Sequence, residues 1–282
     1  MTSIVYAPLL LLLFSTVQCL HCFAPRFHER NSASQYHLRH QRQSIAFPLA
    51  SSTVDDKDVV DPEIKSKAEN LKRDILALAA SYDRGYGATP NVKEKMDGYI
   101  SELASYNDEI TGEDVATGFG TDEYDLSSPL DGVWQMVWTT AFDVLSIATP
   151  ISTVSAIYQV IDTSKSSAVN IIDLIPRVQS FLPPQIPTPI TRLNVQTTAT
   201  RRGPKRVGLI FNSVEVEPIK NVVELPFPIK VDFPTKNLEN LWSDFDSPGY
   251  FDVSFVDQNM LIIQQNVPGG CFISVKVPDT SL

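Results

Sequence analysis

Few side chains in this sequence have the chemistry that catalysis or metal binding needs, and most of those few lie near one end. Two of the three cysteines and all four histidines, His21, His28, His37 and His40, fall within the first 40 residues. Removal of that stretch as a targeting segment would leave a chain with no histidine and one thiol, Cys271. That chain would have no histidine-dependent triad, no zinc site built from His or Cys, and no internal disulfide.

Three aspartates, Asp162, Asp173 and Asp257, remain as candidates for an acid–base pair. Each lies at or near the end of a predicted strand, where a carboxylate usually sits in a solvated turn. The two neighbours of Cys271 carry no positive charge that would lower the pKa of its thiol, so we expect an inert thiol. The sequence also lacks a nucleophile elbow, a P-loop and the dinucleotide-binding glycine pattern. We therefore predict no catalytic residue, no metal site and no cofactor.

Large apolar side chains on strand-like segments form the second kind of candidate site. Alternation within residues 132–140 puts Trp134, Met136 and Trp138 on one strand face. Such side chains either fill an ordinary core or line a pocket for a hydrophobic molecule, and periodicity alone does not separate the two. The predicted ligand-binding set contains Trp134, Met136, Trp138, Tyr158, Phe211, Phe251 and Phe272.

Eight strand-like segments must position these side chains. Turn signals such as residues 164–166, 202–204 and 268–270 separate several of them and indicate sequential hairpins. We predict a mainly β fold, an antiparallel up-and-down barrel, with a β-sandwich as the alternative. The proline-rich stretches 176–190 and 218–234 are predicted to be loops or sheet edges. The eight segments are 132–140, 156–162, 168–175, 191–201, 205–217, 249–256, 260–266 and 271–277.

A short helical pair is predicted before the strands, over residues 61–105. Asp61-Pro62 and Thr89-Pro90 each combine an N-cap residue with proline at the first helical position. Apolar residues follow at helical spacing, so we expect the helices to pack on each other or on the strands. Residues 106–129 contain seven acids, three glycines and no Lys or Arg. This composition predicts a solvated linker.

The first 52 residues have the composition of a targeting sequence. The apolar run 7–17 is shorter than the roughly 20 residues that span a bilayer and is typical of a signal peptide. Residues 23–52 contain four arginines and a single acid, Glu29, as transit peptides do. The predicted segments are a signal peptide (1–22), a transit-like segment (23–52), a helical extension with the acidic linker (53–129) and the barrel (130–282).

The net charge excludes some partners. Residues 53–282 hold 19 Lys and Arg against 32 Asp and Glu, a formal net charge of −13. Such a chain does not bind nucleic acid through bulk electrostatics. Attraction to anionic lipid surfaces is not expected either, so contact with lipid would be apolar. The apolar, proline-rich stretches Ile175–Ile190 and 225–229 are interpreted as loops that cap the barrel, with contact to a lipid surface as the alternative.

Two resemblances extend this interpretation. The junction Cys22-Phe23-Ala24-Pro25 resembles the Phe-Ala-Pro junction of bipartite presequences in algae with secondary plastids, such as diatoms. It implies cleavage after Cys22 and delivery to a plastid through the secretory pathway. Residues 62–277 resemble the plastid lipid-associated proteins, or fibrillins, most clearly at 83–88 (DRGYGA) and 130–140 (LDGVWQMVWTT). The carboxy-terminal motif departs from that family, because Leu261, Gln264 and Gln265 replace the usual Arg, Arg and Gly.

The resemblance implies a lipocalin-like barrel without catalytic activity. It implies a protein of the chloroplast that binds or coats lipids, carotenoids or prenylquinones at thylakoids or plastoglobules, as a structural component at a membrane or lipid-droplet surface. Two alternatives stay open. One is an enzyme or accessory factor that acts on an isoprenoid, quinone or pigment in the barrel pocket. The other is a scaffold that binds partner proteins through the helical pair at 61–105.

Overall fold

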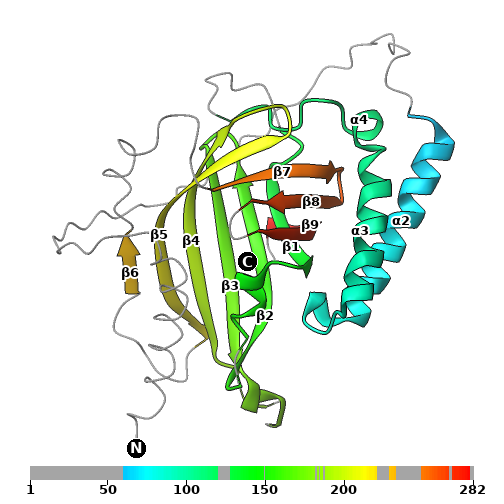
Figure 1. Ribbon diagram of the computed structural model, residues 1–282. Coiled ribbons are helices and arrows are strands. Elements are labelled where there is room, and N and C mark those ends of the chain that lie inside the picture. The colour runs from blue at the N-terminus through cyan, green and yellow to red at the C-terminus, as the bar shows by residue number, and fades with distance from the viewer. Residues whose placement is uncertain are drawn as a thin grey trace, which may run out of the picture. The chain divides into compact units, whose positions relative to one another are not determined.

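A computed structural model describes residues 60–119, 128–148, 150–181, 183, 185–186, 188–220, 229–232, 249–266 and 269–279 (Figure 1). The chain divides into two compact units, residues 1–60 and 61–282, and the described elements belong to the second. The predicted signal peptide (1–22) and transit-like segment (23–52) lie outside the described residues. So does the second proline-rich apolar segment, apart from Ile229.

The core of the fold is a ring of eight antiparallel strands, β1–β5 and β7–β9. Each strand pairs with its neighbour in the order β4-β3-β2-β1-β9-β8-β7-β5, and pairing of β5 with β4 closes the ring. The predicted up-and-down, lipocalin-like barrel is thus confirmed, and the sandwich alternative is wrong. The strands are β1 Gly132–Thr139, β2 Ser152–Asp162, β3 Ser167–Pro176, β4 Ile190–Arg201, β5 Arg206–Lys220, β7 Gly249–Val256, β8 Met260–Gln265 and β9 Gly270–Val277.

The ring is uneven in height, which gives the barrel two different ends. Strands β2–β5 have 10 to 15 residues, whereas β1 and β7–β9 have 6 to 8. β5 pairs with β7 only over 206–209, and its later residues 213–216 pair with the short edge strand β6, Ile229–Asp232. We call the end where β2 begins and β3 ends the open end, and the opposite end the closed end.

Two helices, α2 Pro62–Ser81 and α3 Pro90–Ala104, pack on the outer face of β1 and β7–β9 (Figure 1). Asp61 caps α2 as predicted, with its carboxylate accepting from the N–H of Glu63 at 2.8 Å. The helices bury one shared cluster with the strands, including Ile75, Met96 and Ile273. Both predicted packing modes occur, because the helices contact each other as well as the sheet.

The acidic segment after the helices is not a solvated linker throughout, which corrects the prediction for its first part. After the short helix α4, Asn107–Ile110, the side chains of Val115, Ala116 and Phe119 are buried in the barrel core. The backbone N–H groups of Val115 and Ala116 both donate to Pro204 O, at 3.0 and 2.9 Å. The few apolar residues of this segment therefore close one end of the barrel.

Candidate functional site

The interior at the closed end is a filled core. All eight ring strands contribute a buried or partly buried apolar side chain to one cluster, with Val115, Ala116, Phe119 and Leu130 below them. Trp134 is fully buried in this cluster, and its indole N–H donates to Leu130 O at 2.7 Å. Phe251 is 1 % exposed. This half of the barrel gains its stability from packing and leaves little room for a ligand.

Towards the open end a second apolar cluster lines the interior. Met136 and Ile157 meet Val144 and Ile147, which belong to or follow the short helix α5, Phe142–Leu145. Phe272 packs against both interior clusters and so links the two halves. The inner face of the extended strands therefore continues the barrel core beyond the short strands.

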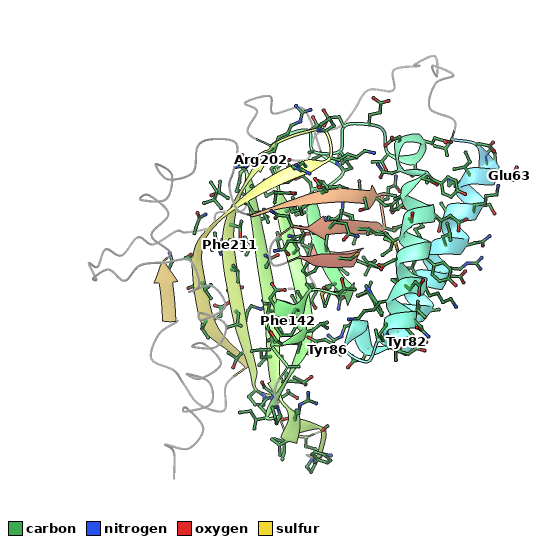
Figure 2. All side chains as sticks on the ribbon, in the orientation of Figure 1. Glu63, Tyr82, Tyr86, Phe142, Arg202 and Phe211 are labelled. Carbon is green, nitrogen blue, oxygen red and sulfur yellow. The ribbon has the colours of Figure 1, made fainter. Side chains whose placement is uncertain are left out.

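The inner faces of β4 and β5 form an apolar surface that is only partly covered. Ala168 and Ala199 face the barrel core, so the cross-strand pairs Val195–Val214 and Thr197–Phe211 also point inward. We call the partly buried members of this face, Leu193, Val195, Phe211 and Val214, the inner trough. Phe211 lies beside Gly249, where a Cβ would stand 3.6 Å from its ring (Figure 2).

A bulge corrects the predicted alternation in β1. Met136 pairs with Ser274 but Trp138 pairs with Ile273, so Val137 is an extra residue and the alternation shifts. Trp138 consequently points to the helices and belongs to their cluster, not to the face of Trp134. Among the described residues its buried indole N–H has no hydrogen-bond partner.

The structure divides the seven predicted ligand-binding residues between two faces. Tyr158 is next to Ile157, which faces the interior, so Tyr158 is on the outer face of β2. Trp138 is likewise on the outer face, in β1. Sequence alternation could not show this, because the faces depend on where each strand bulges. The residues that do face the interior are Trp134, Met136, Phe211, Phe251 and Phe272.

Exposed apolar side chains gather at the open end. Phe181 is 85 % exposed and Phe142 is 73 % exposed. Ile151 lies beside the segment that carries Val178, because the N–H of Arg177 donates to Ile151 O at 3.0 Å. We call the following five residues the rim: Phe142, Ile151, Val178, Phe181 and Ile186. The stretch from 175 to 190 is recognisable in the sequence, whereas Phe142 and Ile151 are not, since a lone apolar residue carries no pattern.

A strained loop ties the helices to the open end. Asp83, Arg84 and Gly85 all have positive φ, at 45°, 58° and 103°. The guanidinium of Arg84 donates to Ser155 O at 3.1 Å and Val154 O at 2.9 Å, where β2 bulges. Ser155 is the residue that this register shift leaves without a partner on β3, and Arg84 hydrogen-bonds its carbonyl. The family-like segment 83–88 is thus a connector between the helical pair and the barrel.

The candidate acid–base residues do not meet. Asp162 accepts from Ser164 and Lys165 in the β2–β3 turn, and Asp257 accepts from Lys72 on α2 at 2.6 Å. Asp173 is not a solvated turn carboxylate, which corrects its prediction. It is 7 % exposed and forms a bidentate ion pair with Arg192, at 2.7 and 2.9 Å. Each carboxylate therefore has a structural partner.

The other titratable groups in the interior of the protein show the effects of burial. Burial raises the pKa of the Cys271 thiol to about 12, so the thiolate is disfavoured, which supports the prediction of an inert thiol. Burial would lower the pKa of Lys72, but its hydrogen bonds to Asp257 and Glu69 raise it. Burial also raises the pKa of Asp143, and its Oδ1 has no partner among the described residues. Within the described ranges, no three His, Cys, Asp or Glu side chains are grouped to hold a metal.

The fold and the site together define a lipocalin-like barrel with one packed end and one apolar end. A model of the PAP_fibrillin family matches residues 69–273 of this chain, so the protein belongs to that family. The family comprises plastid lipid-associated structural proteins that are generally non-enzymatic. No curated protein and no solved structure matched the chain. No helix in the described parts of the chain has the length and apolar content to cross a membrane.

Proposed function

We propose that this protein binds or coats hydrophobic molecules at a lipid surface, as a non-enzymatic component of thylakoids or plastoglobules. The observation that carries the proposal is the rim. Among the described residues six large hydrophobic side chains are exposed, and five of them are the rim residues at one end of the barrel. Scattered exposed apolar residues need no explanation, but a group at one end marks an interaction surface.

The energetics favour lipid as the partner of the rim. Phe142 and Phe181 are each more than 70 % exposed, so transfer into an apolar phase would contribute about 2 kcal/mol for each ring. The rim sits on the segments that join β1 to β2 and β3 to β4, outside the paired parts of these strands. Side chains in such a position can enter the boundary layer of a membrane or droplet while the barrel stays in water.

The inner trough is the proposed site for a bound hydrophobic molecule. It begins at the open end and leads towards Met136 and Phe272, deeper in the barrel. Its lining is apolar and only partly covered, which suits a carotenoid, a prenylquinone or a lipid chain. Of the predicted ligand-binding set, Met136, Phe211 and Phe272 lie along this path. Trp134 and Phe251 belong to the filled core at the closed end, and Trp138 and Tyr158 lie outside the barrel, so these four have no part in the proposal.

The proposed location is a plastid that the chain reaches through the secretory pathway. The apolar run 7–17 and the basic segment 23–52 support the route, and membership of a plastid family supports the destination. A fluorescent protein fused to residues 1–52 tests the route. Plastid import that is lost on replacement of Phe23 is the expected result, and secretion to the medium would contradict it.

A flotation assay with neutral phosphatidylcholine vesicles tests the surface function. The Phe142→Ser/Phe181→Ser double variant is expected to bind at least about ten-fold more weakly than the wild type, because two aromatic contacts with lipid are lost. Leu76→Ser is the matched control, since Leu76 is exposed on α2, outside the rim. Equal flotation of the double variant and the wild type would refute lipid docking by the rim.

A further inference from the structure

A hollow with both polar and apolar walls lies beside the rim. It occupies about 230 Å³ where β2 begins and β3 ends. Thr153 pairs with Ile175 at its floor, and the 3-10 turn Arg177–Phe181 forms its outer wall. The lining residues are Thr153, Ile175, Pro176, Arg177, Ser180 and Phe181.

The polar wall suits an anion. Arg177 supplies a guanidinium, which binds phosphate, sulfonate or carboxylate groups through two parallel N–H donors. Thr153 adds a hydroxyl that can donate to the same anion. The Ser180 hydroxyl donates to Arg177 O at 2.8 Å and so holds the turn in shape. Ile175 and Phe181 add apolar side chains to the same lining, for contact with whatever is attached to the anion.

The local charge differs from the charge of the whole protein. The full chain has a formal net charge of −10. In contrast, residues 174–214 contain no Asp or Glu and six basic residues, of which Arg177 is nearest the rim. Bulk charge therefore disfavours an anionic surface, as the sequence predicts. Five of the six lining residues nevertheless lie in this stretch, and Asp173, just before it, is already paired with Arg192.

The position of the hollow fixes its depth at a membrane. Val178 and Phe181 belong to the same five-residue turn as Arg177, and both are more than half exposed. An apolar face of this kind enters a bilayer by about 5–10 Å, to the boundary between acyl chains and head groups. Insertion of Phe181 would thus leave the guanidinium of Arg177 at the level of the head groups, with its stem along the apolar layer.

We infer that this hollow binds the anionic head group of a lipid, with Arg177 and Thr153 on the charged oxygens and Phe181 beside the acyl chain. The inference deepens the proposed function, on which it rests, because it adds a head-group preference to a surface that docks through apolar contacts. The rim then supplies most of the affinity, and the hollow selects the lipid.

Vesicle binding by the full chain and by residues 53–282 tests the inference. Both forms are needed because the basic segment 23–52 also attracts anionic vesicles. With about 30 % phosphatidylglycerol in phosphatidylcholine, Arg177→Gln is expected to bind about five-fold more weakly than the wild type, which is the usual effect of one basic residue at an anionic surface. Binding to pure phosphatidylcholine should not change.

Lys165→Gln is the matched control, because Lys165 is an exposed basic residue in the turn at the closed end. Equal binding of Arg177→Gln and the wild type to anionic vesicles would overturn the inference, as would an equal loss in both variants. Millimolar inorganic phosphate should not displace the protein, and displacement that depends on Arg177 would indicate a soluble anion instead. A failure of the proposed function is recognised by a different result. If the rim did not dock on lipid, the Phe142→Ser/Phe181→Ser variant would bind neutral vesicles as well as the wild type does.

Discussion

The connector between the helices and the barrel makes a sharp prediction at Gly85. Its φ is +103°, a conformation that side-chain-bearing residues rarely adopt. A Cβ added there would lie 2.2 Å from the backbone oxygen of Thr139 in β1. Because backbone atoms cannot rotate away, Gly85→Ala must either separate the loop from β1 or distort the strand.

The magnitude follows from comparison with two other glycines. Gly112 has a similar φ of +101° and no atom within 4 Å of its added Cβ, so Gly112→Ala should cost only the backbone strain, about 1–2 kcal/mol. Gly98 lies within α3, also with open space around it, so Gly98→Ala should stabilise by about 0.5–1 kcal/mol. Gly85→Ala adds overpacking of about 1–3 kcal/mol to the strain, for a loss of about 3 kcal/mol.

Thermal and denaturant unfolding followed by circular dichroism measures all three variants. For a unit of this size each kcal/mol moves the midpoint temperature by about 2–4 °C, so the order Gly98→Ala, wild type, Gly112→Ala, Gly85→Ala should be clear. The comparison of the last two isolates the contact with β1. If Gly85→Ala lost no more stability than Gly112→Ala, the close packing of this loop on the barrel would be refuted.

Three further predictions concern ionisable groups. Arg192→Met should cost about 2 kcal/mol by leaving Asp173 buried without its partner, and addition of Asp173→Leu should recover most of that loss in chemical denaturation; a double variant as unstable as the single one would contradict this. Burial raises the pKa of Asp143, so the folded state favours the neutral carboxyl. The free energy of unfolding therefore falls as pH rises from below the ordinary pKa of an aspartate through the raised value. Asp143→Asn should increase the free energy of unfolding by about 1 kcal/mol at neutral pH and remove this part of its pH dependence. With its pKa raised to about 12, Cys271 should resist alkylation in the folded protein until denaturant is added, as peptide mapping would show, and rapid labelling without denaturant would count against its burial.

The strands could be predicted because their signal is local. Alternation and turn residues placed β7 at 249–256, the bounds that the structure has, and the other seven within a few residues. The edge strand β6 lies in the stretch 218–234. The prolines of this stretch are compatible with a loop as well as with an edge strand, so the sequence does not distinguish the two. The cap-plus-proline starts placed both helices for the same local reason.

The candidate site depends on features that are not local. Val137 is an extra residue only in relation to its partner strand β9, so no pattern within β1 reveals that Trp138 turns outward. Val115 and Ala116 are isolated among acids, so composition indicates a solvated segment, and only the open barrel end explains their burial. Exposure of Phe142 likewise depends on the orientation of α5, which is set by the packing of Val144 against the surrounding strands.

The bulge in β1 places two tryptophans of one strand in separate environments. Trp134 is buried inside the barrel, where its indole N–H is hydrogen-bonded. Trp138 is buried under the helices, where its indole N–H has no partner in the part of the chain that the structure describes. The third, Trp242, lies outside the described residues. Variants that lack Trp242 and keep either Trp134 or Trp138 would therefore carry a single fluorescent reporter, for opening of the barrel in the first case and for detachment of the helical pair in the second. Two tryptophans only four positions apart thus allow the barrel core and the helix–barrel interface to be followed separately in solution.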